Sequence, residues 1–259
     1  MTAHITLDDV HVRYPVYQTS RQRSILGFAA NAASFGHIAR DAGNIPMVDA
    51  LNGVSLELKD GDRLALMGRN GSGKTTMLKL CAGLIYPDMG EARIAGSRAT
   101  LLNPGAGLDH EKTGVENVEM IGRLLGVPRS KRSALLEDVA EFTELGDFLN
   151  LPIRTYSTGM TVRLMFALAT SVERDILIVD EVVGAGDAIF VEKAARRVRN
   201  MFERARILVL ATHAGEIATR LCNKAIWLDS GRVVMAGGPE LVWDAYINQR
   251  RPHAVEAAA

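Results

Sequence analysis

The stretch that most constrains this chain is residues 64–84, which read L-A-L-M-G-R-N-G-S-G-K-T-T-M-L-K-L-C-A-G-L. Residues 64–67 have the pattern of a short buried strand, 68–73 that of a tight glycine-rich turn, and 74–84 that of a helix. The pattern G-x-x-x-x-G-K-[ST] between a strand and a helix is typical of a phosphate-binding loop. This order of elements favours that interpretation over a chance glycine-rich turn.

The residue types of this loop suit an anion. Its glycines can adopt backbone angles closed to other residues, so consecutive amides can turn inward around phosphate oxygens. The helix that follows adds unpaired N–H groups and the positive end of its dipole. Lys74 is expected to reach the β- and γ-phosphates, and the Thr75 hydroxyl to bind Mg²⁺. We therefore predict that a nucleoside triphosphate is bound by Gly68, Arg69, Asn70, Gly71, Ser72, Gly73, Lys74, Thr75 and Thr76.

Length and composition exclude several classes of protein. A chain of 259 residues can bury a full core, and its 30 basic and 30 acidic residues cancel. No general positive field therefore predicts nucleic-acid binding. The 2 cysteines indicate a reducing compartment. Because we find no signal-peptide pattern and no apolar run near the roughly 20 residues that span a bilayer, we expect a cytosolic protein that meets a membrane through a partner.

Around the loop the sequence predicts strands of two kinds. Residues 4–14 and 50–59 alternate between polar and apolar side chains, which predicts an antiparallel sheet beside the nucleotide-binding core. Residues 176–179 and 207–211 are continuous runs of β-branched residues and leucine, typical of parallel strands buried on both faces. Residues 224–236 are predicted to form a hairpin that turns at a Ser-Gly pair.

Three further segments complete the chain. Residues 113–150 carry helical patterning with Thr113 as N-cap, which predicts a helical subdomain at about 112–165. Ser157 is a fitting N-cap for another helix, whose predicted buried face is Val162, Phe166, Ala169 and Val172. Residues 15–49 are an extra segment, either a surface loop or an amphipathic helix resting on a membrane or a partner. Its apolar residues at helical spacing are Ile25, Phe28, Ala29, Ala32, Phe35 and Ala39.

The second half of the chain supplies residues that can act on a bound triphosphate. Asp180 follows a predicted buried strand and is expected to hold Mg²⁺, often through water. Glu181 comes next and is placed to polarise the attacking water as a general base. His213, at the end of the neighbouring strand, is expected to hydrogen-bond the γ-phosphate.

Together, G-R-N-G-S-G-K-T-T, Y-S-T-G-M and I-L-I-V-D-E, followed by His213, resemble the nucleotide-binding subunit of an ABC transporter. The resemblance implies an α/β fold, that of a P-loop NTPase with a mainly parallel core sheet, a flanking antiparallel β subdomain and an inserted helical subdomain. The resemblance covers roughly residues 4–245, and we expect one nucleotide-binding domain over residues 1–249. The composition of residues 250–259 predicts a flexible tail. The resemblance also implies an ATPase that takes ATP and Mg²⁺.

The resemblance assigns further residues to the site. Ser157 and Gly159 match the serine and glycine whose amides bind the γ-phosphate held by the opposite subunit, which implies a homodimer that sandwiches ATP. Asp187 matches an aspartate at the dimer seam. Tyr14 is similar to the aromatic residue that stacks on adenine, and Tyr17 is the alternative. The glutamine that binds Mg²⁺ in the family is missing, and Asn103 or Asp109 is the candidate for its place.

Three stretches resemble one branch of the family closely: G-A-G-L-D-H-E-K-T-G-V-E-N, Y-S-T-G-M-T-V-R-L and D-E-V-V-G-A-G-D-A-I-F. This branch exports lipid-linked polysaccharides, namely O-antigen, capsule and teichoic acid. The resemblance implies two copies of this chain, peripheral to the cytoplasmic face of the inner membrane, beneath two copies of a polytopic membrane subunit that handles the polysaccharide. The alternatives are an ABC-type ATPase for another substrate, a soluble ABC ATPase acting on ribosomes or DNA, and a P-loop kinase for a small molecule.

Overall fold

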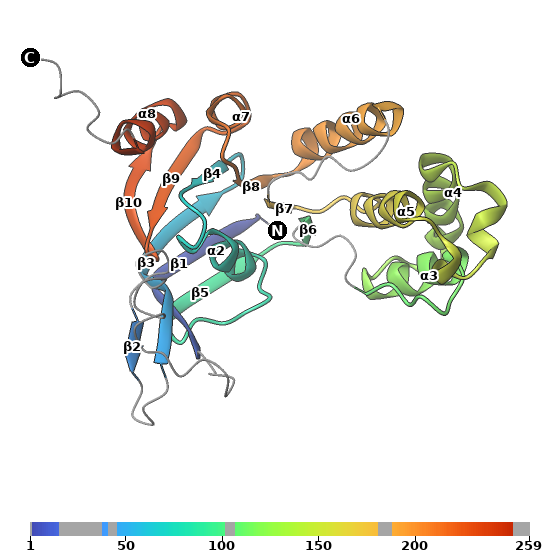
Figure 1. The fold of residues 1–259 in the computed structure, drawn as a ribbon, viewed down its shortest axis with the longest axis horizontal. Helices are drawn as coiled ribbons and strands as arrows, with labels where there is room; N and C mark the ends of the chain where they lie inside the picture. Colours follow the sequence, from blue (N-terminus) through green and yellow to red (C-terminus); the bar gives the residue numbers. More distant parts are fainter. Residues whose placement is uncertain (1, 16–37, 41–45, 102–106, 181–187, 251–259) are drawn as a thin grey trace, which may run out of the picture. The chain divides into compact units, whose positions relative to one another are not determined.

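The computed structural model describes residues 2–15, 38–40, 46–101, 107–180 and 188–250. The chain divides into two compact units, and Figure 1 shows the elements of each. The first unit comprises Met1–Ser97, Ile178–Glu181 and Arg206–Ala259. The second comprises Arg98–Leu177 and Val182–Ala205.

The first unit contains an antiparallel sheet with strand order β2-β3-β1-β5. Its strands are β1 (His4–Pro15), β2 (Ile38–Arg40), β3 (Pro46–Lys59) and β5 (Met89–Ala95). Both strands predicted here are present and pair with each other. The register shifts between Leu7 and Val10, where Asp9 has φ 45°, so both apolar residues are buried although they lie three positions apart.

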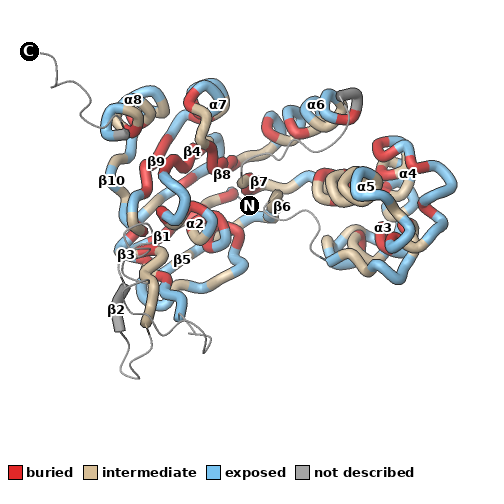
Figure 2. Tube along the Cα trace, in the orientation of Figure 1, coloured by how far each residue is buried: buried red, intermediate tan, exposed pale blue. Residues whose placement is uncertain are grey.

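The second sheet of this unit is mainly parallel, with order β10-β9-β4-β8-β7. Its strands are β4 (Arg63–Met67), β8 (Ile207–Ala211), β9 (Lys224–Asp229), β10 (Arg232–Gly237) and the end of β7 (Ile176–Asp180). β4 runs parallel to β8 and β9, whereas β10 is antiparallel to β9. Every residue of β8 is buried (Figure 2), as a continuous apolar run predicts.

Three helices accompany this sheet: α2 (Lys74–Cys81), α7 (Gly215–Leu221) and α8 (Pro239–Arg250). α2 begins directly after the glycine-rich loop and buries Met77, Leu78 and Leu80. α8 contacts β9, where the rings of Trp227 and Tyr246 lie 5.7 Å apart. The apolar side chains of α2 therefore anchor the loop to the core of the unit.

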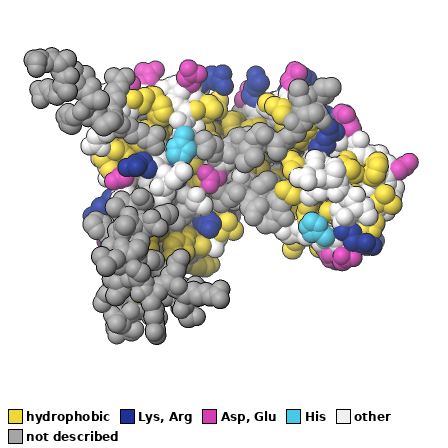
Figure 3. Space-filling model, viewed as in Figure 1, with side chains coloured by type: hydrophobic (Ala, Val, Ile, Leu, Met, Phe, Trp, Pro, Cys, Tyr) yellow, Lys and Arg dark blue, Asp and Glu magenta, His cyan; other side chains and the backbone are white. Residues whose placement is uncertain are grey.

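The second unit is mostly helical. It contains β6 (Arg98–Leu101), α3 (Gly114–Leu124), α4 (Arg132–Thr143), α5 (Thr158–Thr170), α6 (Ala188–Arg204) and the short 3₁₀ turns η1 (Arg129–Lys131), η2 (Gly146–Asn150) and η3 (Ile153–Thr155). Thr113 caps α3 as predicted, in a capping box with Glu116. Figure 3 shows acidic and basic side chains interspersed on the visible face of this unit.

The core of this unit joins three helices through aromatic side chains. Phe142 of α4, Phe166 of α5 and Phe190 of α6 lie with ring centroids 5.5–6.0 Å apart. The unit extends beyond the predicted 112–165 because Phe190 brings α6 into this core.

The predicted buried face of α5 is wrong. The buried residues of the helix are Leu164, Ala167, Leu168 and Thr170. The four predicted residues, Val162, Phe166, Ala169 and Val172, are all half-buried. The helix is apolar on nearly every side, so its spacing allowed more than one buried stripe, and tertiary packing chose between them.

Several predictions lie partly or wholly outside the described residues. Ala39 was predicted to share a helical face, but it lies in β2, which pairs with β3. The rest of that apolar face lies within 16–37, outside the described part of the chain. Arg250 ends α8, and the remainder of the predicted tail, 251–259, is likewise not described. Within the described ranges, no helix combines the length and apolar character that crossing a membrane requires.

Candidate nucleotide-binding site

The glycine-rich loop connects β4 to α2, as the sequence predicts. Gly71 and Gly73 have φ 80° and 105°, in the region that side chains disfavour. A Cβ atom at Gly73 would lie 2.4 Å from the carbonyl oxygen of Ala50, and one at Gly68 would lie 2.4 Å from that of Leu228. The loop therefore needs glycine at these positions both for its backbone angles and for the close approach of neighbouring strands.

Lys74 lies across this loop at the start of α2. Its Nζ donates hydrogen bonds to the carbonyl oxygens of Gly68 at 2.8 Å and Arg69 at 3.0 Å. The side chain is nearly buried, with 9% exposure, so the positive charge is held inside the loop. The Ser72 hydroxyl is also buried and has no hydrogen-bond partner among the described residues. A buried cation and an unused hydroxyl in one loop suit an anionic ligand.

Two predicted magnesium ligands lie together. The Thr75 hydroxyl donates to a carboxylate oxygen of Asp180 at 3.2 Å, which joins the start of α2 to the end of β7. A hydroxyl and a carboxylate are oxygen ligands of the kind that Mg²⁺ prefers, with water completing its coordination. The pair therefore fits the ion. Among the described residues there is no cluster of three or more His, Cys, Asp and Glu side chains that could hold a metal by themselves.

A cavity of about 390 Å³ opens beside the loop, within the range of small-molecule sites. It brings together predicted site residues that are far apart in sequence. Its lining residues are Tyr14, Val48, Asp49, Ala50, Asn70, Gly71, Gly73, Lys74, Thr75, Thr76, Asp180 and His213. All of them belong to the first unit.

Tyr14 is held at this cavity by polar contacts of its neighbour. The side chain of Arg13 donates from Nε to Asp49 at 2.9 Å, and the Arg13 amide donates to Asp88 at 2.6 Å. Tyr14 pairs with Val48 across β1 and β3 and is 39% exposed. The end of β1 is therefore fixed while the tyrosine ring remains accessible.

Val48, Asp49 and Ala50 also line the cavity, although they are not among the predicted site residues. β3 begins at Pro46, four residues before the predicted start of this strand at residue 50. The length of the first predicted strand, 4–14, could have revealed these lining residues. The second strand runs antiparallel to the first, so it must begin before residue 50 if residue 14 is to have a partner.

Ser157 and Gly159 lie in the second unit, at the start of α5. The Ser157 side chain accepts a hydrogen bond from the amide of Met160 at 3.2 Å, so it caps the helix as predicted. A Cβ atom at Gly159 would meet only the Ser157 hydroxyl, at 3.9 Å. The segment before it is anchored because the Tyr156 hydroxyl donates to the carbonyl of Phe148 at 2.8 Å. Burial raises the pKa of this tyrosine.

Three predicted site residues lie outside the described part of the chain: Asn103, Glu181 and Asp187. Asp109, the alternative to Asn103, is described and lies in the second unit. Its carboxylate accepts from Lys112 at 2.7 Å and from the Glu111 amide at 3.0 Å. The Lys112 hydrogen bond holds the pKa of Asp109 below its usual range.

This site defines a P-loop nucleotide-binding protein. A strand of a mainly parallel sheet leads into a glycine-rich loop that holds a buried lysine, and a helix follows the loop. The sequence model of the ABC transporter family matches residues 51–184, and this chain belongs to that family. The resemblance found in the sequence and the predicted fold class are thereby confirmed.

Similar proteins narrow the relationship to one branch. The chain is 41% identical to the O-antigen export system ATP-binding protein RfbE of Yersinia enterocolitica, over 87% of this chain and 94% of that protein. It is 36% identical to RfbB of Myxococcus xanthus over 92% of this chain, which spans only 55% of that longer protein. It is 35% identical to the teichoic acids export ATP-binding protein TagH of Bacillus cereus, over 71% of this chain and 33% of that protein.

Solved structures support the fold. A dimeric post-hydrolysis structure of the ATP-binding cassette MJ0796 with ADP and Pi has a TM-score of 0.64 at 21% identity, covering 91% of this chain and 98% of the other. An ATP-binding subunit of an ABC transporter has a TM-score of 0.66 at 21% identity, covering 93% and 92%.

Proposed function

We propose that this chain is the ATP-hydrolysing subunit of an ABC transporter that exports a lipid-linked polysaccharide, of the O-antigen, capsule or teichoic acid class. The observation that carries this proposal is the 41% identity to an O-antigen export ATP-binding protein over most of both chains. The cavity beside the phosphate loop supports it, because its lining residues suit a nucleoside triphosphate.

ATP binding is assigned to the first unit. The amides of the loop, with the ammonium of Lys74, bind the phosphates through charge-assisted hydrogen bonds. Tyr14 offers an accessible ring against which adenine stacks. The cavity residues between the phosphate loop and Tyr14 determine how long a ligand can bind at both ends.

Magnesium is assigned to the side chains of Thr75 and Asp180, with Asn103 as a third candidate. Bound there, the ion would neutralise charge on the phosphates. Asp180 contributes its carboxylate from the end of β7, and α2 orients the threonine hydroxyl toward it.

Hydrolysis is assigned to two residues that follow adjacent core strands. Glu181, directly after β7, accepts a proton from the attacking water as general base, which is worth about 10²–10⁴ in rate. His213, two residues after the end of β8, lines the cavity and donates to the terminal phosphate. Lys74 stabilises negative charge that develops on the same group.

The working assembly is a homodimer on a membrane partner. Ser157, Gly159 and Asp187 are assigned to the ATP bound by the opposite copy. Two copies of a separate polytopic subunit carry the polysaccharide, which this chain reaches only indirectly. The chain is peripheral to the cytoplasmic face of the inner membrane. Of the predicted extra segment 15–49, residues 46–49 belong to β3, and Val48 and Asp49 line the cavity. We keep contact with that partner or with lipid headgroups as a prediction for residues 16–37, which lie outside the described residues.

Two substitutions separate ATP binding from hydrolysis. Glu181→Gln should bind ATP with near wild-type affinity and lose most of its turnover, because the general base is removed while the loop is intact. Lys74→Ala should weaken ATP binding itself. Lys79→Ala, an exposed lysine on the same helix, is the matched control.

Binding is measured by calorimetry and turnover by phosphate release. In cells that depend on this chain, both site variants should leave polysaccharide on the inner side of the cytoplasmic membrane. Near-normal turnover in Glu181→Gln would remove that residue from the role. Normal surface polysaccharide with Lys74→Ala would reject the export function.

A further inference from the structure

The turn between β9 and β10 lies against the phosphate loop. Ser230 and Gly231 have φ 49° and 76°, and the two positive values identify a tight hairpin turn. The Gly231 amide donates to the Ser72 carbonyl at 3.0 Å, and the Gly231 carbonyl accepts from the Asn52 amide at 2.8 Å. One residue of a distant hairpin therefore joins the loop to β3 through both of its backbone groups.

The β9–β10 turn, the phosphate loop and β3 meet too closely to admit a side chain at Gly231 or Gly73. A Cβ atom at Gly231 would lie 2.9 Å from the Ala50 carbonyl oxygen and 3.1 Å from its carbon. A Cβ atom at Gly73 would lie 2.4 Å from the same oxygen and 3.5 Å from the Cα of Gly231. Any residue other than glycine at 231 must push β3 away from the hairpin, and so from the loop that the hairpin holds.

These contacts fix the direction of an amide in the loop. In a planar trans peptide the C=O and N–H groups point in opposite directions. Because Gly231 holds the Ser72 carbonyl, the Gly73 N–H is directed away from the hairpin, and Gly73 lines the cavity. On the other side, Gly231 holds β3, which carries Val48 and pairs with Tyr14.

We propose that Gly231 is a positioning residue that fixes the phosphate loop at a set separation from β3, and so from the wall of the cavity that receives the base. This separation allows the phosphates of a nucleoside triphosphate to bind the loop while its base packs against the end of β1. The inference rests on the proposed ATP binding. It predicts that Gly231 contributes to affinity without touching the nucleotide.

The test compares Gly231→Ala with Gly126→Ala in the full-length protein. Gly126 has φ 72°, close to that of Gly231, but a Cβ atom there meets nothing within 4 Å. Both variants place alanine at a similar positive φ, and only Gly231→Ala crowds β3. Dissociation constants are measured for ATP and for inorganic tripolyphosphate, and melting temperatures are recorded without ligand.

We expect Gly231→Ala to weaken ATP binding about tenfold, because the base can no longer stack fully on Tyr14 while the phosphates stay on the loop. Tripolyphosphate binding should weaken less, so the preference for ATP over tripolyphosphate falls, whereas Gly126→Ala keeps the wild-type preference. If Gly231 has a purely structural role, Gly231→Ala should change the dissociation constants for ATP and tripolyphosphate by the same factor. Equal factors for the two ligands, or unchanged dissociation constants, would overturn the proposal.

If Gly231→Ala does not fold, hydrogen exchange on the wild-type protein decides. ATP should slow exchange of the Gly231 and Asn52 amides, because the ligand holds together the segments that they join. Unchanged exchange at both amides would reject the positioning role. Failure of the wild-type protein to bind ATP would instead reject the proposed function, and this inference with it.

Discussion

The two cysteines show how burial changes the chemistry of single residues. Cys81 is fully buried on α2, below the phosphate loop, and Cys222 is buried after α7. Burial raises the pKa of each thiol from 9.0 to about 12. Because the thiolate is the reactive form, neither side chain is suited to redox or nucleophilic chemistry in the folded protein.

These pKa values predict resistance to thiol reagents. At pH 8 the folded protein should not react with a disulfide reagent such as dithionitrobenzoate, whereas the protein in guanidinium should titrate 2 thiols. Rapid labelling of the folded protein would contradict the burial of these side chains.

The same values predict how stability depends on pH. The thiol pKa is higher in the folded than in the unfolded state, so the contribution to stability is present below pH 9. It is lost as the pH rises toward about 12, because the unfolded chain loses thiol protons first. Chemical unfolding curves recorded between pH 9 and about 12 should show a falling free energy of unfolding. Replacing both cysteines by alanine should make this fall smaller.

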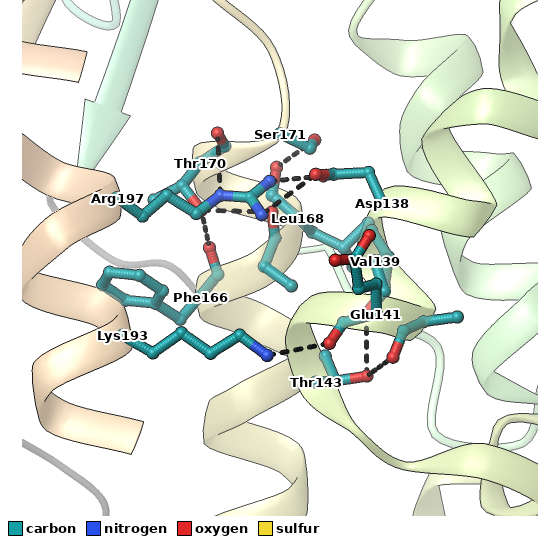
Figure 4. Close-up of polar contacts among 12 residues, drawn as sticks. Asp138, Val139, Glu141, Thr143, Phe166, Leu168, Thr170, Ser171, Lys193 and Arg197 are labelled. Atoms are coloured by element: carbon teal, nitrogen blue, oxygen red, sulfur yellow. Dashed lines mark hydrogen bonds and ion pairs between the residues drawn. The ribbon is translucent and has the colours of Figure 1, made fainter. Parts of the chain in front are cut away.

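Among the elements, α6 is attached to its neighbours by cations as well as by aromatic packing (Figure 4). Arg197 makes a two-pronged ion pair with Asp138 of α4, and its guanidinium lies 4.5 Å from the ring centroid of Phe142. One turn earlier, Lys193 donates to the Glu141 carbonyl at 2.8 Å. Since α6 follows directly after 181–187, these contacts fix the chain on the C-terminal side of the proposed catalytic Glu181.

Replacing Arg197 by alanine should lower the free energy of unfolding by about 2 kcal/mol, because Asp138 loses its partner and Phe142 loses a packed neighbour. Arg196→Ala is a close control, since that side chain is exposed and pairs only with Glu192 of its own helix among the interactions described. Its effect should stay below about 0.5 kcal/mol. Urea unfolding gives both values, and equal losses would show that the contacts to α4 contribute nothing special.

At the scale of the whole molecule, the residues assigned to ATP are divided between two compact units. Lys74, Thr75, Asp180 and His213 belong to the first unit, and Ser157 and Gly159 to the second. In the proposed homodimer, the second unit of one copy completes the site of the other. ATP would then hold two copies together, and its hydrolysis would release them.

A bulky residue at the start of α5 should block this assembly without unfolding the chain. Gly159 is exposed and has open space at its Cβ position, so Gly159→Arg should be tolerated by the monomer. We expect Glu181→Gln to form an ATP-dependent dimer, and Glu181→Gln with Gly159→Arg to bind ATP but remain monomeric. Gly238→Arg, another open glycine, is the control on the first unit. Light scattering with and without ATP measures the molar mass of each variant. A dimer of the double variant in the presence of ATP would show that Gly159 is not at the interface.

The sequence by itself determined the features that depend on local chemistry. The phosphate loop, the caps at Thr113 and Ser157, the hairpin turn and the buried strands all follow from which residues can adopt a turn, cap a helix or fill a core. The motifs also identified the family, because their spacing is specific. The roles of Glu181, Asp187 and Asn103 stay predictions, since these residues lie outside the described part of the chain.

Tertiary structure decided what depends on contacts between distant segments. Sequence alone could not show that Asp49 would hold Arg13 beside the cavity, that α5 would bury Leu164 rather than Val162, or that Gly231 would close on Ser72. Each of these outcomes depends on which surfaces meet after folding. Local patterns leave several faces or partners equally acceptable, and close packing of the whole unit selects one of them.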